Sequence, residues 1–141
     1  MSRKELAGEM IKQINDAIEK KAAHLLGDSG ITKSQLMVLL LFLKAPDDTM
    51  TLKEVERALH CAQSTAHGLV TRLEEKKLVI SKGDPEDRRI RVIQITEAGK
   101  EHCRETEKKV MMLEKTLLEP LDEQEQEQFL EYLSRVKKAL V

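Results

Sequence analysis

Hydrophobic residues recur at helical spacing near the start of the chain. The pattern predicts a helix from Lys4 to Leu26 that ends at Gly27, a residue that favours helix ends. Its apolar face consists of Leu6, Met10, Ile14, Ile18, Ala22 and Leu25.

A second helix is predicted by the strongly apolar run LMVLLLFL, residues 36–43. Thr32 and Gln35 form a capping-box pattern just before this run, and Pro46 interrupts it. Because the run is apolar on all sides, we expect this helix at the centre of the fold.

The next two predicted helices are close together. Thr51 and Glu54 repeat the capping pattern and open a short helix through Leu59, after which HCAQ leads into a longer helix. A short helix, a tight turn and a longer helix indicate a helix-turn-helix. The second member has an inward stripe of Ala66, Leu69, Val70 and Leu73. Its other side carries Ser64, Thr65, His67, Gly68, Thr71 and Arg72, which could also be only the solvated face of an amphipathic helix.

A hairpin pattern follows this helix. Residues 79–81 begin one strand, residues 83–85 are turn formers, and the β-branched segment 90–95 is expected to return as the second strand. Near the tip, Asp87 can hold one guanidinium in a bidentate pair while another arginine, Arg88 or Arg89, projects outward. A charged tip could be a solvated loop, but a helix followed by such a ribbon is the layout of a winged helix, whose helix suits a major groove and whose wing suits a minor groove.

The C-terminal third predicts two more helices. Thr96 can cap a helix from Glu97 to about Leu118; Pro120 ends it, and Asp122 with Glu125 caps the last one. Both bear broad apolar stripes that a single copy of the chain leaves uncovered, so a homodimer is expected, because a second copy is the economical cover. These stripes contain Cys103, Val110, Met111, Met112, Leu113, Leu117, Leu118, Phe129, Leu130, Leu133, Val136 and Leu140.

Composition and charge narrow the class of protein. The 141 residues fit one domain, and 2% aromatic residues with 35% charged residues favour a mainly helical chain with a small β-wing. The net charge of −1 gives no global basic field, but residues 51–92 carry nine Lys or Arg against seven Asp or Glu, whereas residues 93–141 carry eight against eleven. No apolar run suits a membrane span and the N-terminus lacks a signal-peptide core, so a cytoplasmic protein is expected.

The segment DPEDRRIRVIQITEAGK, residues 84–100, resembles the wing and following helix start of the MarR family of bacterial and archaeal transcription regulators. LEEKKLV and ITKSQLMVLLLF are similar to the end of that family's recognition helix and to its second helix. The resemblance implies one MarR-type domain, residues 1–141, with dimerisation helices in 1–30 and 97–141 around a winged helix-turn-helix lobe in 31–96. It also implies a homodimeric repressor that binds double-stranded DNA at a pseudo-palindromic operator and is released by a small aromatic or phenolic effector or a stress signal.

Site residues follow from the same resemblance. Arg88 or Arg89 would enter the minor groove, and Asp87 would brace the wing. Two positions depart from the family. Lys77 stands where glycine is common, so either the helix lacks its left-handed cap or Lys77 adopts the left-handed conformation at a cost of about 1 kcal/mol. The Lys77 side chain could instead contact a phosphate. Gly68 stands where a larger polar residue is common. Bases and phosphates would be contacted by Ser64, Thr65, His67, Thr71 and Arg72.

Alternative functions depend on other residues. An enzyme or metal site would need His60 with Cys61 or His102 with Cys103, but adjacent side chains on a helix diverge by about 100° and cannot close one tetrahedral site. We therefore expect no enzymatic activity and no cofactor. Cys61, just before the recognition helix, could sense oxidants or simply fill the turn. A winged helix used only for protein contacts, without DNA, is the remaining alternative.

Overall fold

A computed structural model describes residues 5–141 as six α-helices and an antiparallel three-stranded sheet. The elements follow the order α1 (Ala7–Leu26), α2 (Lys33–Lys44), a 3-10 turn η1 (Pro46–Asp48), β1 (Thr49–Thr51), α3 (Leu52–Leu59), α4 (Gln63–Glu75), β2 (Val79–Gly83), β3 (Arg91–Ile95), α5 (Glu97–Leu118) and α6 (Glu123–Leu140). The predicted fold class, mainly α with a small β-wing, is confirmed. The predicted helix start at Lys4 lies outside the described residues.

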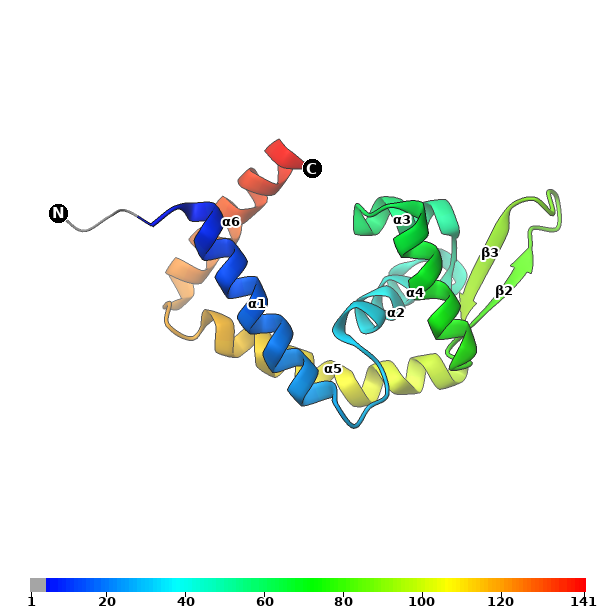
Figure 1. Ribbon diagram of the computed structural model, residues 1–141, viewed down its shortest axis with the longest axis horizontal. Helices are drawn as coiled ribbons and strands as arrows, with labels where there is room; N and C mark the ends of the chain where they lie inside the picture. Colours follow the sequence, from blue (N-terminus) through cyan, green and yellow to red (C-terminus); the bar gives the residue numbers. More distant parts are fainter. Residues whose placement is uncertain (1–4) are drawn as a thin grey trace.

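Helix α5 runs along the base of the molecule and joins two parts (Figure 1). On one side, α2, α3, α4 and the sheet form a compact unit, which we call the lobe. On the other side, α1 and α6 rise from the C-terminal half of α5, and we call these three helices the arm. The β2–β3 hairpin projects from the lobe at the end opposite the arm.

The sheet has the order β1-β3-β2. Strand β1 pairs with β3 from Thr49↔Gln94 to Thr51↔Val92, while β2 pairs with β3 out to Gly83↔Arg91. The sequence predicted only the β2–β3 hairpin. Three residues are too few to show strand periodicity, and β1 forms because Met50 is buried beside Ile93 in the sheet. Outward from residue 91, the wing is therefore a two-stranded ribbon.

The core lies beneath the helix-turn-helix. Helix α2 packs at its centre, as predicted, and contacts α1, α3, α4, α5 and β3. Two of its apolar residues, Met37 and Leu43, are nevertheless exposed, so the helix is not buried on every side. The largest fully buried side chains include Leu36, Leu39, Phe42, Val55, Val70, Leu73 and Ile93.

Side-chain caps fix the helix starts. The capping boxes predicted at Thr32–Gln35 and Asp122–Glu125 are both complete. Thr51 and Thr96 each accept one backbone N–H, from Glu54 and Gly99 respectively. After α1, however, Gly27 stays right-handed with φ −50°, and Gly30 is the glycine with positive φ, at 82°. The backbone reversal thus comes three residues later than the sequence indicated.

Lys77 adopts the left-handed conformation that usually belongs to glycine, with φ 62°. Its N–H donates to the Glu74 carbonyl at 2.9 Å, and the N–H of Leu78 donates to the Leu73 carbonyl at 3.0 Å. These two bonds form a Schellman motif, which closes α4 and turns the chain into β2. The backbone therefore has the left-handed conformation expected of the glycine that is common at this position in the family, although the residue is a lysine.

Replacing Lys77 with glycine should raise the free energy of unfolding by about 1 kcal/mol, because a left-handed lysine backbone is strained and a glycine backbone is not. The matched control is Lys77→Ala, which removes the same ammonium but keeps a Cβ at positive φ. Urea denaturation of both variants measures the effect. Equal midpoints for the glycine and alanine variants would show that strain at Lys77 is negligible.

Candidate nucleic-acid interface

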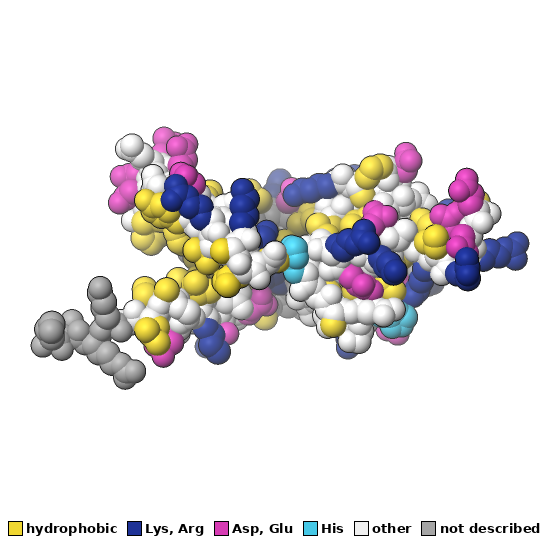
Figure 2. Space-filling model, turned by 90° about the horizontal axis from the view of Figure 1, so that it is seen from above, with side chains coloured by type: hydrophobic (Ala, Val, Ile, Leu, Met, Phe, Trp, Pro, Cys, Tyr) yellow, Lys and Arg dark blue, Asp and Glu magenta, His cyan; other side chains and the backbone are white. Residues whose placement is uncertain are grey.

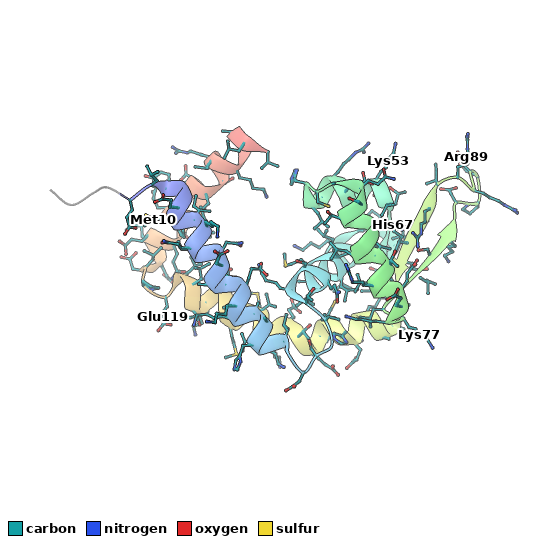
Figure 3. The ribbon with its side chains drawn as sticks, in the orientation of Figure 1. Met10, Lys53, His67, Lys77, Arg89 and Glu119 are labelled. Atoms are coloured by element: carbon teal, nitrogen blue, oxygen red, sulfur yellow. The ribbon has the colours of Figure 1, made fainter. Side chains whose placement is uncertain are left out.

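The outer face of α4 is polar and accessible. Ser64, Thr65, His67 and Arg72 are exposed and Thr71 is half-buried, whereas Ala66, Val70 and Leu73 face the core. This division follows the predicted stripe. His67 lies on the side of α4 that faces away from the sheet (Figure 3). The five polar residues predicted for base and phosphate contact therefore share one helix face.

The wing tip holds one arginine in a fixed position. Arg89 donates from Nε to Oδ1 of Asp87 and from Nη2 to Oδ2, both at 3.1 Å, and its backbone N–H also donates to Oδ1. The Arg89 side chain is still 91% exposed. These hydrogen bonds lower the pKa of Asp87 below its ordinary value of 3.8, so the pair is ionised at neutral pH. The guanidinium is thus oriented and accessible at once.

Further cations surround this face of the lobe. Lys53, at the start of α3, lies with Arg89 along the upper edge of the lobe in Figure 3. Sequence reasoning did not single it out, because one exposed lysine on a short helix carries no pattern. Figure 2 shows Lys and Arg side chains projecting at the wing end of the molecule. The lobe cations that make no ion pair within residues 5–141 are Lys44, Lys53, Arg57, Arg72, Lys76, Lys77, Lys82 and Arg88.

The structure also brings together two residues that the sequence analysis missed. Glu74, near the end of α4, pairs with Arg91, the first residue of β3, at 2.6 Å. The two are far apart in the sequence and belong to different elements, so no local periodicity could have linked them. Their ion pair ties the recognition helix to the wing.

In the described part of the chain, no three His, Cys, Asp or Glu side chains lie together in a way that could hold a metal ion. Cys103 is buried in the core, and the neighbouring His102 has a buried Nε2 without a hydrogen-bond partner. Cys61 is half-buried and lines a cavity of about 310 Å³ between α2 and α4. A redox role for Cys61 stays a prediction.

The two thiols should differ in reactivity. Burial, aided by the Glu107 carboxylate, raises the pKa of Cys103 to about 11, so its reactive thiolate is rare at pH 7.5 and increases only as the pH approaches that value. Iodoacetamide at pH 7.5 should therefore alkylate Cys61 before Cys103, as peptide mass spectrometry would measure. Cys61→Ser should leave the native chain almost unlabelled. Labelling of Cys103 first would contradict the assigned burial.

Within residues 5–141, no helix is both long and apolar enough to cross a membrane.

A search of curated protein sequences gives no match. A family model described as the MarR family matches residues 29–90, which include the helix-turn-helix and most of the wing.

Solved structures resemble the whole chain. The Staphylococcus aureus MepR–DNA complex is 26% identical with a TM-score of 0.91, covering 97% of this chain and 100% of that chain. A mutant MarR from Escherichia coli, complexed with operator DNA, is 26% identical with a TM-score of 0.82, covering 95% and 93%. The PcaV regulator of Streptomyces coelicolor with its natural ligand is 22% identical with a TM-score of 0.84 over 100% of both chains, a likeness of fold alone.

Three findings now agree: a winged helix-turn-helix with a polar recognition face, a family model over that lobe, and similarity to DNA-bound regulators along almost the full chain. MarR-family proteins are DNA-binding transcriptional regulators rather than enzymes, in agreement with the sequence-based expectation. Residues 29–90 match the MarR family, and almost the whole chain shares the fold of winged helix-turn-helix transcriptional regulators of that family.

Proposed function

We propose that this protein is a homodimeric repressor that binds a pseudo-palindromic operator with its two lobes. The observation that carries the proposal is the exposed polar face of α4 beside an arginine-tipped wing. An α-helix fits the major groove, where base edges can be read, and a narrow minor groove attracts arginine. Residues 31–96 would be the reading lobe. The bases and phosphates of the major groove would be contacted by Ser64, Thr65, His67, Thr71 and Arg72.

Arg89 is our candidate for the minor groove. Asp87 already holds it in the bidentate pair, so little side-chain freedom is lost when DNA binds. Arg88 is exposed at the same tip and makes no ion pair within residues 5–141, which suits a mobile phosphate contact. The sequence left the choice between the two arginines open, and the pairing of Asp87 favours Arg89.

We expect dimerisation through residues 1–30 and 97–141, which contain the three helices of the arm. Hydrophobic side chains are gathered over the arm in Figure 2, and α6 buries none of its residues in the single chain. A second copy would cover this apolar surface and place two lobes about a two-fold axis, as an inverted repeat requires. The exposed apolar residues of the arm include Met10, Ile11, Ile14, Met111, Met112, Leu130, Tyr132, Leu133, Val136 and Leu140.

A cavity of about 570 Å³ between α1 and α5 is a candidate effector pocket. Ala17, Leu25 and Leu113 contribute apolar walls, and its charged lining is cationic, from Lys20 and Lys21, with His24 beside them. A small aromatic carboxylate matches that combination. The effector would favour a dimer whose lobe spacing no longer fits two consecutive major grooves, so operator would be released by a population shift.

Benzoate-type carboxylates should release operator DNA from the wild-type protein, whereas the corresponding neutral alcohols should not. Lys20→Ala should raise the concentration needed for release by about tenfold, the loss of one charge-assisted contact. Lys12→Ala is the control, because Lys12 pairs with Asp16 and lies outside the cavity. Fluorescence anisotropy of labelled operator measures release. An equal shift in both variants would reject the pocket.

Selection from a random duplex library tests the proposed function itself. The purified protein should enrich an inverted repeat with half-site centres about 10 base pairs apart, and its affinity should fall steeply as salt rises. Light scattering should report a dimer before DNA is added. No enriched sequence together with no salt-sensitive duplex binding would overturn the proposal, and would favour a winged helix that contacts only proteins.

A further inference from the structure

One carboxylate in α4 contacts both strands of the wing. Nη2 of Arg91, at the start of β3, donates to Oε1 and Oε2 of Glu74 at 2.7 and 2.6 Å. The Ser81 hydroxyl, on β2, donates to Oε1 of the same Glu74. The side chains of Arg91 and Glu74 are only 32% and 26% exposed, so water competes weakly for this contact.

This contact lies where the wing loses its other support. The pairing of β1 with β3 ends at Val92, and Arg91 pairs only with Gly83 on the opposite strand. Beyond that pair, the tip is closed by the N–H of Asp84 donating to the Ile90 carbonyl at 2.9 Å. Two-stranded ribbons are marginally stable in water on their own. The Glu74 contact is therefore the side-chain link that we find between α4 and the base of the tip.

We infer that Glu74 is a positioning residue that sets the angle between the recognition helix and the wing. This inference rests on the proposed function. With Arg91 held by Glu74 and Arg89 held by Asp87, α4 and the wing tip present their groups in one geometry before DNA arrives. Without Glu74, the tip must be ordered during binding, and the entropy of ordering opposes association.

Glu74→Ala should weaken operator binding about tenfold and reduce the salt slope by less than one for each wing, because Arg89 then keeps its groove contact in only part of the bound complexes. Glu75→Ala is the matched control, since Glu75 is the exposed neighbouring glutamate on α4 and makes no ion pair or side-chain hydrogen bond within residues 5–141. Glu74→Ala/Arg91→Ala also removes the arginine that Glu74→Ala leaves unpaired, and it should behave like Glu74→Ala. Fluorescence anisotropy over a salt series measures all variants.

A double-mutant cycle separates positioning from general destabilisation. If Glu74 acts through the wing tip, Glu74→Ala should add almost no loss in an Arg89→Ala background. A full tenfold further loss in that background would overturn the inference.

Amide hydrogen exchange of the free protein gives a readout independent of DNA. Glu74→Ala should accelerate exchange at the tip amides, such as Asp84 and Ile90, while the core amides of α2 keep their protection. Unchanged exchange at the tip would reject the positioning role even if the wild-type protein binds DNA. If the wild-type protein binds no duplex, the proposed function fails, and exchange alone decides whether Glu74 orders the wing.

Discussion

Replacing Arg89 with alanine is expected to weaken operator binding about a hundredfold, because a dimer loses one charged groove contact in each of its two wings. The salt slope should fall by about one per wing, since each lost cation releases fewer counterions. Because Asp87 already orients the Arg89 guanidinium in the free protein, Arg89 loses little conformational entropy when DNA binds. Replacing Arg89 with alanine therefore recovers little entropy to offset the lost contact. A mobility-shift salt series with the selected operator measures both quantities.

Two further arginines define the comparison. Arg88→Ala should reduce affinity for every sequence by a smaller factor, as expected for a phosphate contact. Arg104→Ala is the control, because Arg104 lies on α5, outside the lobe, and pairs with Glu101. Unchanged affinity and salt slope in Arg89→Ala would discard the proposed minor-groove contact. A larger loss in Arg88→Ala than in Arg89→Ala would exchange the roles of the two residues.

Features set by neighbouring residues were predictable from the sequence. The capping boxes at Thr32 and Asp122 need only a residue and its partner three positions later, and both formed. The inward stripe of α4 follows from helical periodicity in the same way. Because helix starts and faces depend on local geometry, the order of the helices could be predicted, and so could the residues on the exposed side of α4.

Features set by contacts across the fold were not predictable. Strand β1 depends on burial of Met50 beside Ile93, and Glu74 meets Arg91 only after the wing has folded against α4. The sequence offered two conformations for Lys77, and the left-handed one is present because the Schellman bonds satisfy two carbonyls at the end of α4. Similarly, the order Asp-Arg-Arg in the wing was compatible with either arginine pairing with Asp87.

Gly99 lies in the first turn of α5, where that helix packs closely against the lobe. A Cβ at this position would lie 2.3 Å from the Leu78 carbonyl oxygen and 2.7 Å from Cγ1 of Ile95. The same carbonyl already accepts hydrogen bonds from the backbone N–H and the hydroxyl of Thr96, both at 3.0 Å. The beginning of α5 is thus packed directly on the residue that follows the left-handed Lys77, between α4 and the wing.

Gly99→Ala should therefore lower the free energy of unfolding by about 3 kcal/mol, because backbone on one side and a buried side chain on the other cannot move apart without disturbing the sheet. Gly8→Ala is the control: no atom lies within 4 Å of its added Cβ, and alanine favours helix, so it should be neutral or stabilising by up to about 1 kcal/mol. Urea denaturation followed by circular dichroism measures both. Equal stability of the two variants would mean that Leu78 and Gly99 can move apart at little cost. The angle between α4 and the wing, on which the proposed contacts with the major and minor grooves depend, would then not be rigid.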